Sequence, residues 1–228
     1  MTDRPNIFLA IQSRNLKTVQ ETLRDSDCLE SKYENGSTPL HMAALAGFGE
    51  IVSEILSHRP NLESRNEEEQ TALMGACALG RSGIVAQLLR AGALPDGTGP
   101  FPKETALMMS AITSAPDCLR LVLEAGANVN GKNDAGATAL MTAVHWNHVE
   151  SVKLLIQAGA SVDLQDRRGR TALFHAVAAD RDAVCSYLLE VGANPDLTDN
   201  DGVSPRMLAA ESANIRVRAC FDGPVRDR

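Results

Sequence analysis

Apolar positions along the chain recur with the spacing of one face of a helix. Between residues 51 and 56 they fall at positions i, i+1, i+4 and i+5, and the same spacing returns between residues 84 and 89. This spacing places the apolar side chains on one face of an α-helix. A shorter apolar segment with Ala43 and Ala44 precedes the first of these faces, and its small side chains allow a neighbouring helix to approach. The pattern predicts an all-α fold built from pairs of short helices.

The helix pairs recur with a fixed period. The residues that open them are Thr38, Thr71, Thr105, Thr138 and Thr171, with Ser204 in the next position. The steps between them are 33 residues, apart from one step of 34 between Thr71 and Thr105. A hydroxyl side chain caps the first turn of a helix, and a proline after it, as in Thr38-Pro39, suits the first helical position. A constant period predicts units that each pack on their neighbours.

The repeated phrase resembles that of a known family. Residues 38–43 read Thr-Pro-Leu-His-Met-Ala, and a period of about 33 residues built on T-P-L-H-x-A is typical of ankyrin repeats. The resemblance covers nearly the whole chain. It implies an α-solenoid of helix-turn-helix units with projecting β-turns, whose first helices and turn tips line a concave groove that binds partners. It also implies that His41 makes structural hydrogen bonds within its turn.

The period predicts one domain over residues 1–221. We expect an N-terminal capping repeat at 1–32, five repeats at 33–65, 66–99, 100–132, 133–165 and 166–198, a C-terminal capping repeat at 199–221 and a flexible tail at 222–228. Two sites depart from the pattern. Arg59-Pro60 replaces the usual Gly-Ala after a second helix, so we expect an irregular connection there. Residues 95–102 contain three prolines and two glycines, which disfavour a regular turn.

Composition limits the function classes. The net charge of −7 disfavours a nucleic-acid binder, which normally carries a basic stripe. The five cysteines are dispersed without a C-x-x-C motif, which favours core positions in a reducing compartment over disulfides or a zinc site. The chain shows neither a signal peptide nor an apolar run approaching the ~20 residues of a membrane span. We therefore expect a cytoplasmic protein, monomeric on its own, that uses no cofactor and binds no membrane.

Aligning the repeats on their threonines places the candidate binding residues at turn tips and at the ends of first helices. Trp146 is the only tryptophan and lies next to His145. Aromatic and arginine side chains are enriched in binding hot spots. The turn tips are polarised, since one is acidic and another basic. The candidate partner-binding residues are Trp146, His145, Phe101, Arg167, Arg168, Arg170, Glu67, Glu68, Tyr33, Leu79 and Ile112. The alternatives are that Trp146 packs between repeats and that the tip charges are only solvated.

The chain contains no G-x-S-x-G, phosphate-binding glycine loop or H-E-x-x-H. We therefore expect a non-catalytic module that binds a partner protein as an adaptor or regulator. One alternative is an inhibitor or self-protection protein that blocks a partner enzyme. A second is a metal-dependent enzyme using His145, His148 and Cys185, although His148 fits a structural turn position. A third is an array that forms part of a homo-oligomer.

Overall fold

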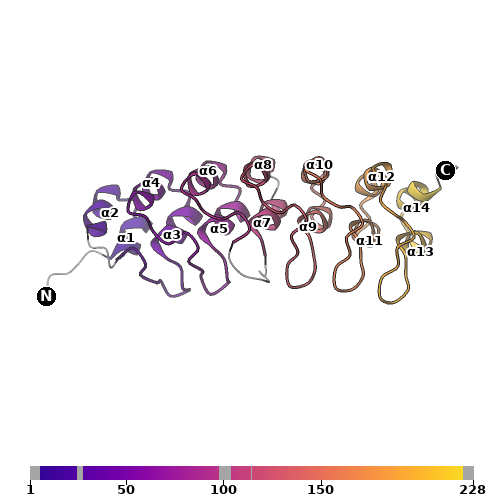
Figure 1. The fold of residues 1–228 in the computed structure, drawn as a ribbon, viewed down its shortest axis with the longest axis horizontal. Coiled ribbons are helices and arrows are strands. Elements are labelled where there is room, and N and C mark those ends of the chain that lie inside the picture. Colours follow the sequence, from indigo (N-terminus) through magenta and orange to yellow (C-terminus); the bar gives the residue numbers. More distant parts are fainter. Residues whose placement is uncertain (1–5, 25–27, 98–103, 114, 223–228) are drawn as a thin grey trace. The chain divides into compact units, whose positions relative to one another are not determined.

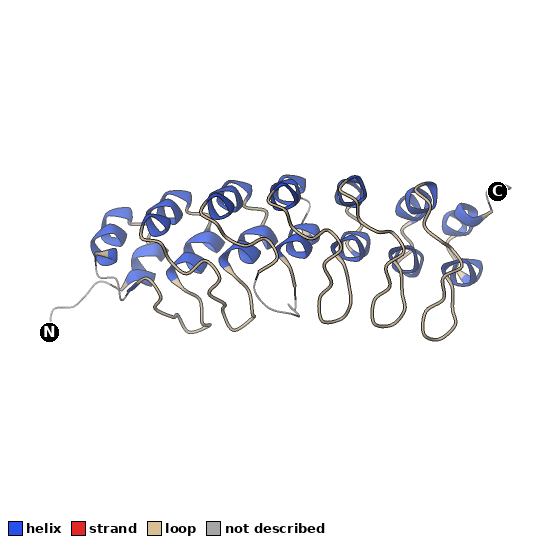
Figure 2. Ribbon diagram, in the orientation of Figure 1, coloured by secondary structure: helices blue, strands red, loops and turns tan. Residues whose placement is uncertain are grey.

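The computed structural model describes residues 6–24, 28–97, 104–113 and 115–222. Within these ranges the chain forms 14 helices of six to nine residues and no strand (Figures 1 and 2). The all-α prediction is therefore confirmed. None of the described helices has the length and apolar character that a membrane crossing requires. Phe101, most of the proline-rich segment 95–102 and residues 223–228 of the predicted tail lie outside the described residues.

The chain divides into two compact units, residues 1–128 (unit 1) and residues 129–228 (unit 2). Unit 1 contains α1 (Ile7–Gln12), α2 (Leu16–Leu23), α3 (Pro39–Ala46), α4 (Gly49–Ser57), α5 (Ala72–Ala78), α6 (Ser82–Arg90), α7 (Ala106–Ile112) and α8 (Pro116–Glu124). Unit 2 contains α9 (Ala139–His145), α10 (Val149–Gln157), α11 (Ala172–Ala178), α12 (Asp182–Glu190), α13 (Pro205–Glu211) and α14 (Ile215–Phe221). Within each unit, the first helix of one pair packs against the first helix of the next pair, and second helices pack likewise. The single domain over residues 1–221 stays a prediction.

The periodic hydroxyl residues define where the first helices begin. Each is an N-cap whose side-chain oxygen accepts the backbone N–H three residues later, from Thr38 to Ser204. In the first full repeat this cap is extended by His41. The His41 Nδ1 accepts the Thr38 N–H at 3.3 Å, and its Nε2 donates to the Gln70 carbonyl at 2.9 Å. Burial lowers the pKa of His41, so the neutral ring that this bonding pattern requires is favoured.

The short turn before each first helix forms a projecting loop that we call a finger. The described fingers are residues 33–37 and 66–70 in unit 1, and 133–137, 166–170 and 199–203 in unit 2. Successive fingers are hydrogen-bonded through their backbones. The Arg167 N–H donates to Ala135 O at 3.0 Å, and the Asn200 N–H donates to Arg168 O at 2.9 Å. Each finger of unit 2 is therefore held by its neighbour in that unit.

Two residues adopt a left-handed backbone where the pattern would use glycine. Glu69 has φ 63° at the finger position that Gly136 and Gly169 occupy with φ 76°. Arg59 has φ 56° after α4, where Gly92 follows α6 with φ 100°. The prediction of an irregular connection at Arg59-Pro60 is therefore wrong, because Arg59 adopts the left-handed conformation of the glycine that it replaces. Pro60 does lack the N–H group that the equivalent residue Ala93 donates to Leu88 O.

A second set of contacts joins the repeats after the second helices. Side-chain oxygens spaced one repeat apart accept backbone N–H groups from the following repeat. The pairs are Glu30 with Asn61, Glu63 with Leu94 and Asp96 with Asn128 in unit 1, and Asn130 with Ser161 and Asp163 with Asn194 in unit 2. These bonds join neighbouring repeats through the segments that follow their second helices.

The contact between fingers predicts different costs at two glycines. A Cβ at Gly136 would lie 2.8 Å from the Arg167 N, whereas a Cβ at Gly159 would meet nothing within 4 Å. Both have positive φ, so Gly159→Ala carries only the conformational cost of roughly 1–2 kcal/mol. We expect Gly136→Ala to lower the free energy of unfolding by a further ~1–3 kcal/mol, because the neighbouring finger must move. Urea denaturation measures both variants, and equal losses would contradict a close finger-to-finger contact.

Candidate functional site

The arginine-bearing finger of unit 2 is shaped by Asp166. The Asp166 Oδ1 accepts the N–H groups of Arg168 at 2.8 Å and Arg170 at 3.0 Å. The Asp166 N–H also donates to Arg170 O at 3.0 Å, which closes the turn. Asn133 makes the same pair of side-chain bonds in the preceding finger. The turn geometry is therefore independent of the side chains at its apex.

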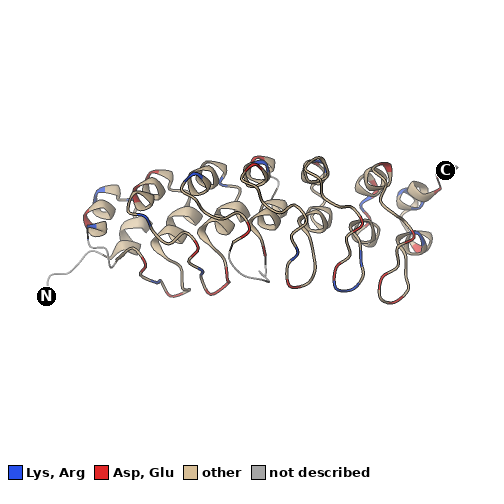
Figure 3. Cartoon of the chain, viewed as in Figure 1, with Lys and Arg blue, Asp and Glu red and all other residues tan. Residues whose placement is uncertain are grey.

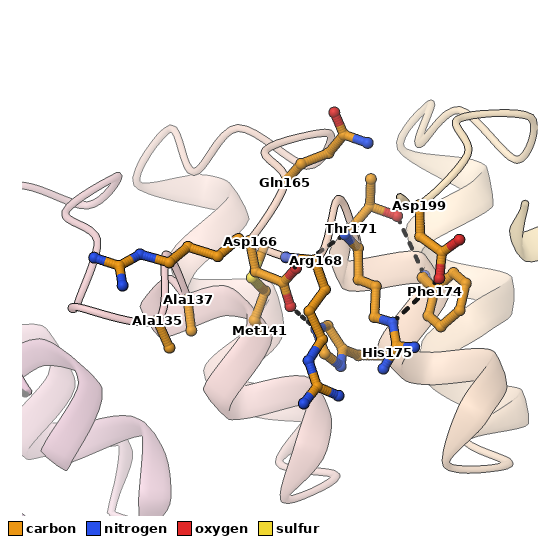
Figure 4. A network of polar contacts seen from close by, with 12 residues as sticks. Ala135, Ala137, Met141, Gln165, Asp166, Arg168, Thr171, Phe174, His175 and Asp199 are labelled. Carbon is orange, nitrogen blue, oxygen red and sulfur yellow. Dashed lines mark hydrogen bonds and ion pairs between the residues drawn. The ribbon is translucent and has the colours of Figure 1, made fainter. Parts of the chain in front are cut away.

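His175, in the last turn of α11, contacts the same aspartate. Its Nε2 lies 3.0 Å from the Asp166 Oδ2, so both carboxylate oxygens of Asp166 have partners (Figure 4). Sequence reasoning assigned no role to His175. The contact joins the base of the finger to the helix that follows it.

Arg170 is engaged within the protein. Its Nε donates to the Asp199 Oδ2 at 3.3 Å, and its guanidinium carbon lies 4.9 Å from the centroid of the Phe174 ring. The Asp199 side chain is only 2% exposed. Burial raises the pKa of Asp199, but N–H donors from Val203 and Asp201 and the Arg170 guanidinium outweigh it and leave the pKa below its ordinary value. Partner binding by Arg170 stays a prediction, and its charge already has a partner.

Arg167 and Arg168 occupy the apex of this finger and are exposed. Across the part of the chain that the structure describes, neither side chain has a hydrogen-bond or ion-pair partner. Lys132 adds a third cation nearby, because its ammonium donates to the Gln165 carbonyl at 2.8 Å. Figure 3 shows this finger in blue. Exposed acidic groups nearby are Asp134 and Asp201, on the two flanking fingers.

Trp146 lies at the C-terminal end of α9 and is 53% exposed. The His145 ring, also exposed, meets the Trp146 ring edge-on at a centroid distance of 5.7 Å. The alternative in which Trp146 is buried between repeats is therefore wrong. The two rings form an exposed aromatic pair whose binding role stays a prediction.

These side chains come from neighbouring elements of unit 2. Helices α9 and α11 pack against each other; His145 and Trp146 lie at the C-terminal end of α9, and His175 lies in the last turn of α11. The finger that leads into α11 adds Arg167 and Arg168. We call Arg167, Arg168, His175, His145 and Trp146 the basic-aromatic face.

Unit 1 carries candidate residues of different chemistry. Glu67 and Glu68 are exposed on the finger 66–70, and the Glu67 N–H donates to Asn35 O at 3.1 Å. Leu79, at the end of α5, is 50% exposed and has the same repeat position as Trp146. Two other candidates are less accessible. The Tyr33 ring packs against the Phe8 ring at a centroid distance of 5.2 Å, and Ile112 is half-buried.

The residues of the alternative metal site are not brought together. Cys185 is 0% exposed in the core, and burial raises the pKa of its thiol to about 12. His145, by contrast, is exposed, and His148 is half-buried at the N-cap of α10. The described residues contain no group of three His, Cys, Asp or Glu side chains that could hold a metal ion.

The cysteine prediction is partly confirmed. Cys77, Cys118 and Cys185 are buried, but Cys28 and Cys220 are only partly buried, so the core assignment is wrong for these two. None of the five, all of which lie in the described ranges, forms a disulfide.

Comparisons with known proteins agree with this architecture. A family model described as "Ankyrin repeats (3 copies)" matches residues 7–98, 95–166 and 158–218. The solved ankyrin repeat domain of Bcl-3 has a TM-score of 0.83 at 24% identity and covers 98% of this chain and 100% of that one. The human ASB11 ankyrin repeat domain has a TM-score of 0.84 at 23% identity, and the match covers 97% of this chain and 99% of that one. These structures confirm the predicted fold.

Curated relatives match over about half of the chain. E3 ubiquitin-protein ligase KEG of Arabidopsis thaliana is 32% identical over 51% of this chain and 7% of its own length. E3 ubiquitin-protein ligase XBAT33 of Arabidopsis thaliana is 35% identical over 47% of this chain and 21% of its own length. A transient receptor potential cation channel subfamily A member 1 homolog of Caenorhabditis elegans is 31% identical over 47% of this chain and 9% of its own length. The matches thus span about a fifth or less of each relative.

The finger geometry predicts that Asp166 acts through its acceptor oxygen. Asp166→Asn keeps an oxygen for the two N–H donors, as Asn133 does in its own finger, so we expect little loss of stability. Asp166→Ala leaves both N–H groups without that acceptor and should lower the free energy of unfolding by about 1–3 kcal/mol. Urea denaturation compares the two. An equal loss in both variants would instead assign the stabilising role to the charge contact with His175.

Proposed function

Because the chain belongs to the ankyrin repeat family, we propose that it is a non-catalytic module that binds a partner protein as an adaptor or regulator. Ankyrin repeats generally bind proteins. The observation that carries the proposal for this chain is Trp146, a large aromatic side chain that is half exposed beside His145 on α9. Tryptophan is among the residues most enriched in binding hot spots.

The surroundings of Trp146 support an interaction role. The helix that carries it begins at the buried N-cap Thr138 and packs against α10 and α11, so the ring projects from a fixed backbone. A rigid backbone reduces the entropy lost on binding. The apolar surface of the ring would be removed from water in a complex, which favours association.

The printed names of the relatives support no single activity. Two are E3 ubiquitin-protein ligases and one is a cation channel homolog. Because the matching segments cover a small share of those proteins, we propose for this chain only the binding role that ankyrin repeats share. We also propose a cytoplasmic location, since five dispersed cysteines outside any disulfide suit a reducing compartment.

The proposal predicts that Trp146→Ala abolishes the capture of at least one partner protein. Purified chain is used to capture proteins from a lysate of the source cells, and the recovered proteins are quantified by mass spectrometry. We expect at least one protein to be lost with Trp146→Ala, because truncating a hot spot costs about 2 kcal/mol or more, roughly 30-fold in affinity.

Ile215→Ala is the matched control, because Ile215 is an exposed apolar residue at the start of α14, away from α9 in sequence and packing. It should retain that protein, and circular dichroism should show both variants folded. Equal recovery of every protein by Trp146→Ala and the original chain would contradict the role of Trp146. Recovery of the chain itself as the sole partner would contradict the adaptor role.

A further inference from the structure

On the finger 166–170 the Arg170 side chain is paired with Asp199, whereas Arg167 and Arg168 on the basic-aromatic face are exposed. This difference points to the chemistry of the partner. We infer that the face receives an extended acidic segment of a partner protein, with carboxylates at Arg167 and Arg168 and a large apolar side chain at Trp146. The inference rests on the proposed function and adds the class of segment that the module binds.

The carboxylates closest to the arginine apex are already occupied. Asp166 accepts two backbone N–H groups and contacts His175, and Asp199 accepts two further N–H groups and the Arg170 guanidinium. Neither aspartate contacts Arg167 or Arg168 through its side chain. The two guanidinium groups therefore retain their capacity for an external carboxylate, which arginine binds with two parallel hydrogen bonds.

The apex is also held in place before any ligand arrives. On one side the Arg167 N–H donates to Ala135 O, and on the other the Asn200 N–H donates to Arg168 O. The Asn200 Nδ2 adds a bond to Arg167 O at 3.0 Å. The residues that make these bonds, Ala135 and Asn200, are uncharged. Binding would then order mainly the arginine side chains.

The length of α9 sets the spacing expected in the ligand. Trp146 follows the N-cap Thr138 by eight residues, which is roughly 12 Å along a helix. The arginine apex lies beyond the N-caps, and an extended segment advances about 3.3 Å per residue, so an apolar side chain at least four residues from the acidic ones would reach Trp146. His145 lies beside Trp146, and the Nε2 of His175 is already engaged by Asp166.

The extent of the positive charge disfavours a nucleic acid. At this finger the exposed cations are Arg167, Arg168 and, at its base, Lys132, and the flanking fingers expose Asp134 and Asp201. A nucleic-acid backbone needs a longer row of cations to track its phosphates. A short acidic protein segment fits a patch of this size.

Peptide selection tests the inference. Random dodecapeptides displayed on phage are selected against the full chain, and the enriched peptides are synthesised with a fluorescent label for binding measurements. We expect enrichment of Asp or Glu residues at least four positions from an aromatic or large aliphatic residue. Arg167→Glu combined with Arg168→Glu should weaken the selected peptide at least about tenfold, and replacing its acidic residues by lysine should restore binding to this variant.

Arg90→Glu combined with Arg216→Glu is the matched control. It changes the net charge equally, but its residues are exposed on the second helices α6 and α14. This variant should bind the selected peptide within about twofold of the original chain, since exposed distant charges are screened by salt. An equal loss in both double variants would show that net charge alone controls binding and would overturn the inference.

The remaining outcomes separate the inference from the proposed function. Neutral or basic enriched peptides that lose affinity with Trp146→Ala would leave the proposed function standing and overturn the acidic segment. Binding that requires phosphoserine in place of the glutamates would overturn a carboxylate ligand in favour of a phosphopeptide. Failure to enrich any sequence would contradict both.

Discussion

Backbone hydrogen bonds between neighbouring fingers are the interaction on which the proposed recognition surface of unit 2 depends. They join the finger that carries Arg167 to the finger before it and the finger after it. The bonds require close approach, and a Cβ at Gly136 or Gly169 would lie within 3 Å of the next finger. The buried N-caps fix where each first helix starts, and the side chains of Asn133, Asp166 and Asp199 fix each turn. The side chains at the apex are thus free to vary.

The same backbone therefore presents different chemistry in different repeats. In unit 1 the finger 66–70 exposes glutamates, whereas in unit 2 the equivalent finger 166–170 exposes arginines. The anchor at the base of the finger differs as well. Asn133 supplies its oxygen to its turn, and Asp166 and Asp199 do the same while also contacting His175 and Arg170. Two carboxylates and their partners thus stabilise the fingers, and Arg167 and Arg168 remain available for a partner.

Much of the fold could be predicted from local patterns. The Thr and Ser positions gave the starts of the first helices because a capping hydroxyl acts within three residues. The repeat alignment placed Trp146 at the end of a first helix, where it is exposed. The contacts of Arg170, His175 and the oxygens from Glu30 to Asp163 were missed, because each joins side chains to groups far along the chain. The recurrence of Glu, Asp or Asn at one-repeat spacing could have revealed the acceptor oxygens from Glu30 to Asp163. The left-handed conformation of Arg59 was a context effect, in which packing of the neighbouring helices outweighs the preference for glycine.

Amide hydrogen exchange tests most directly whether the fingers of unit 2 are held by one another. The Arg167 and Asn200 N–H groups donate to the neighbouring finger. We expect both to exchange much more slowly than the same amides in an unstructured peptide. Exchange of Arg167 and Asn200 at the rate of an unstructured peptide would show that the fingers move independently, and would contradict a preformed surface for the proposed partner.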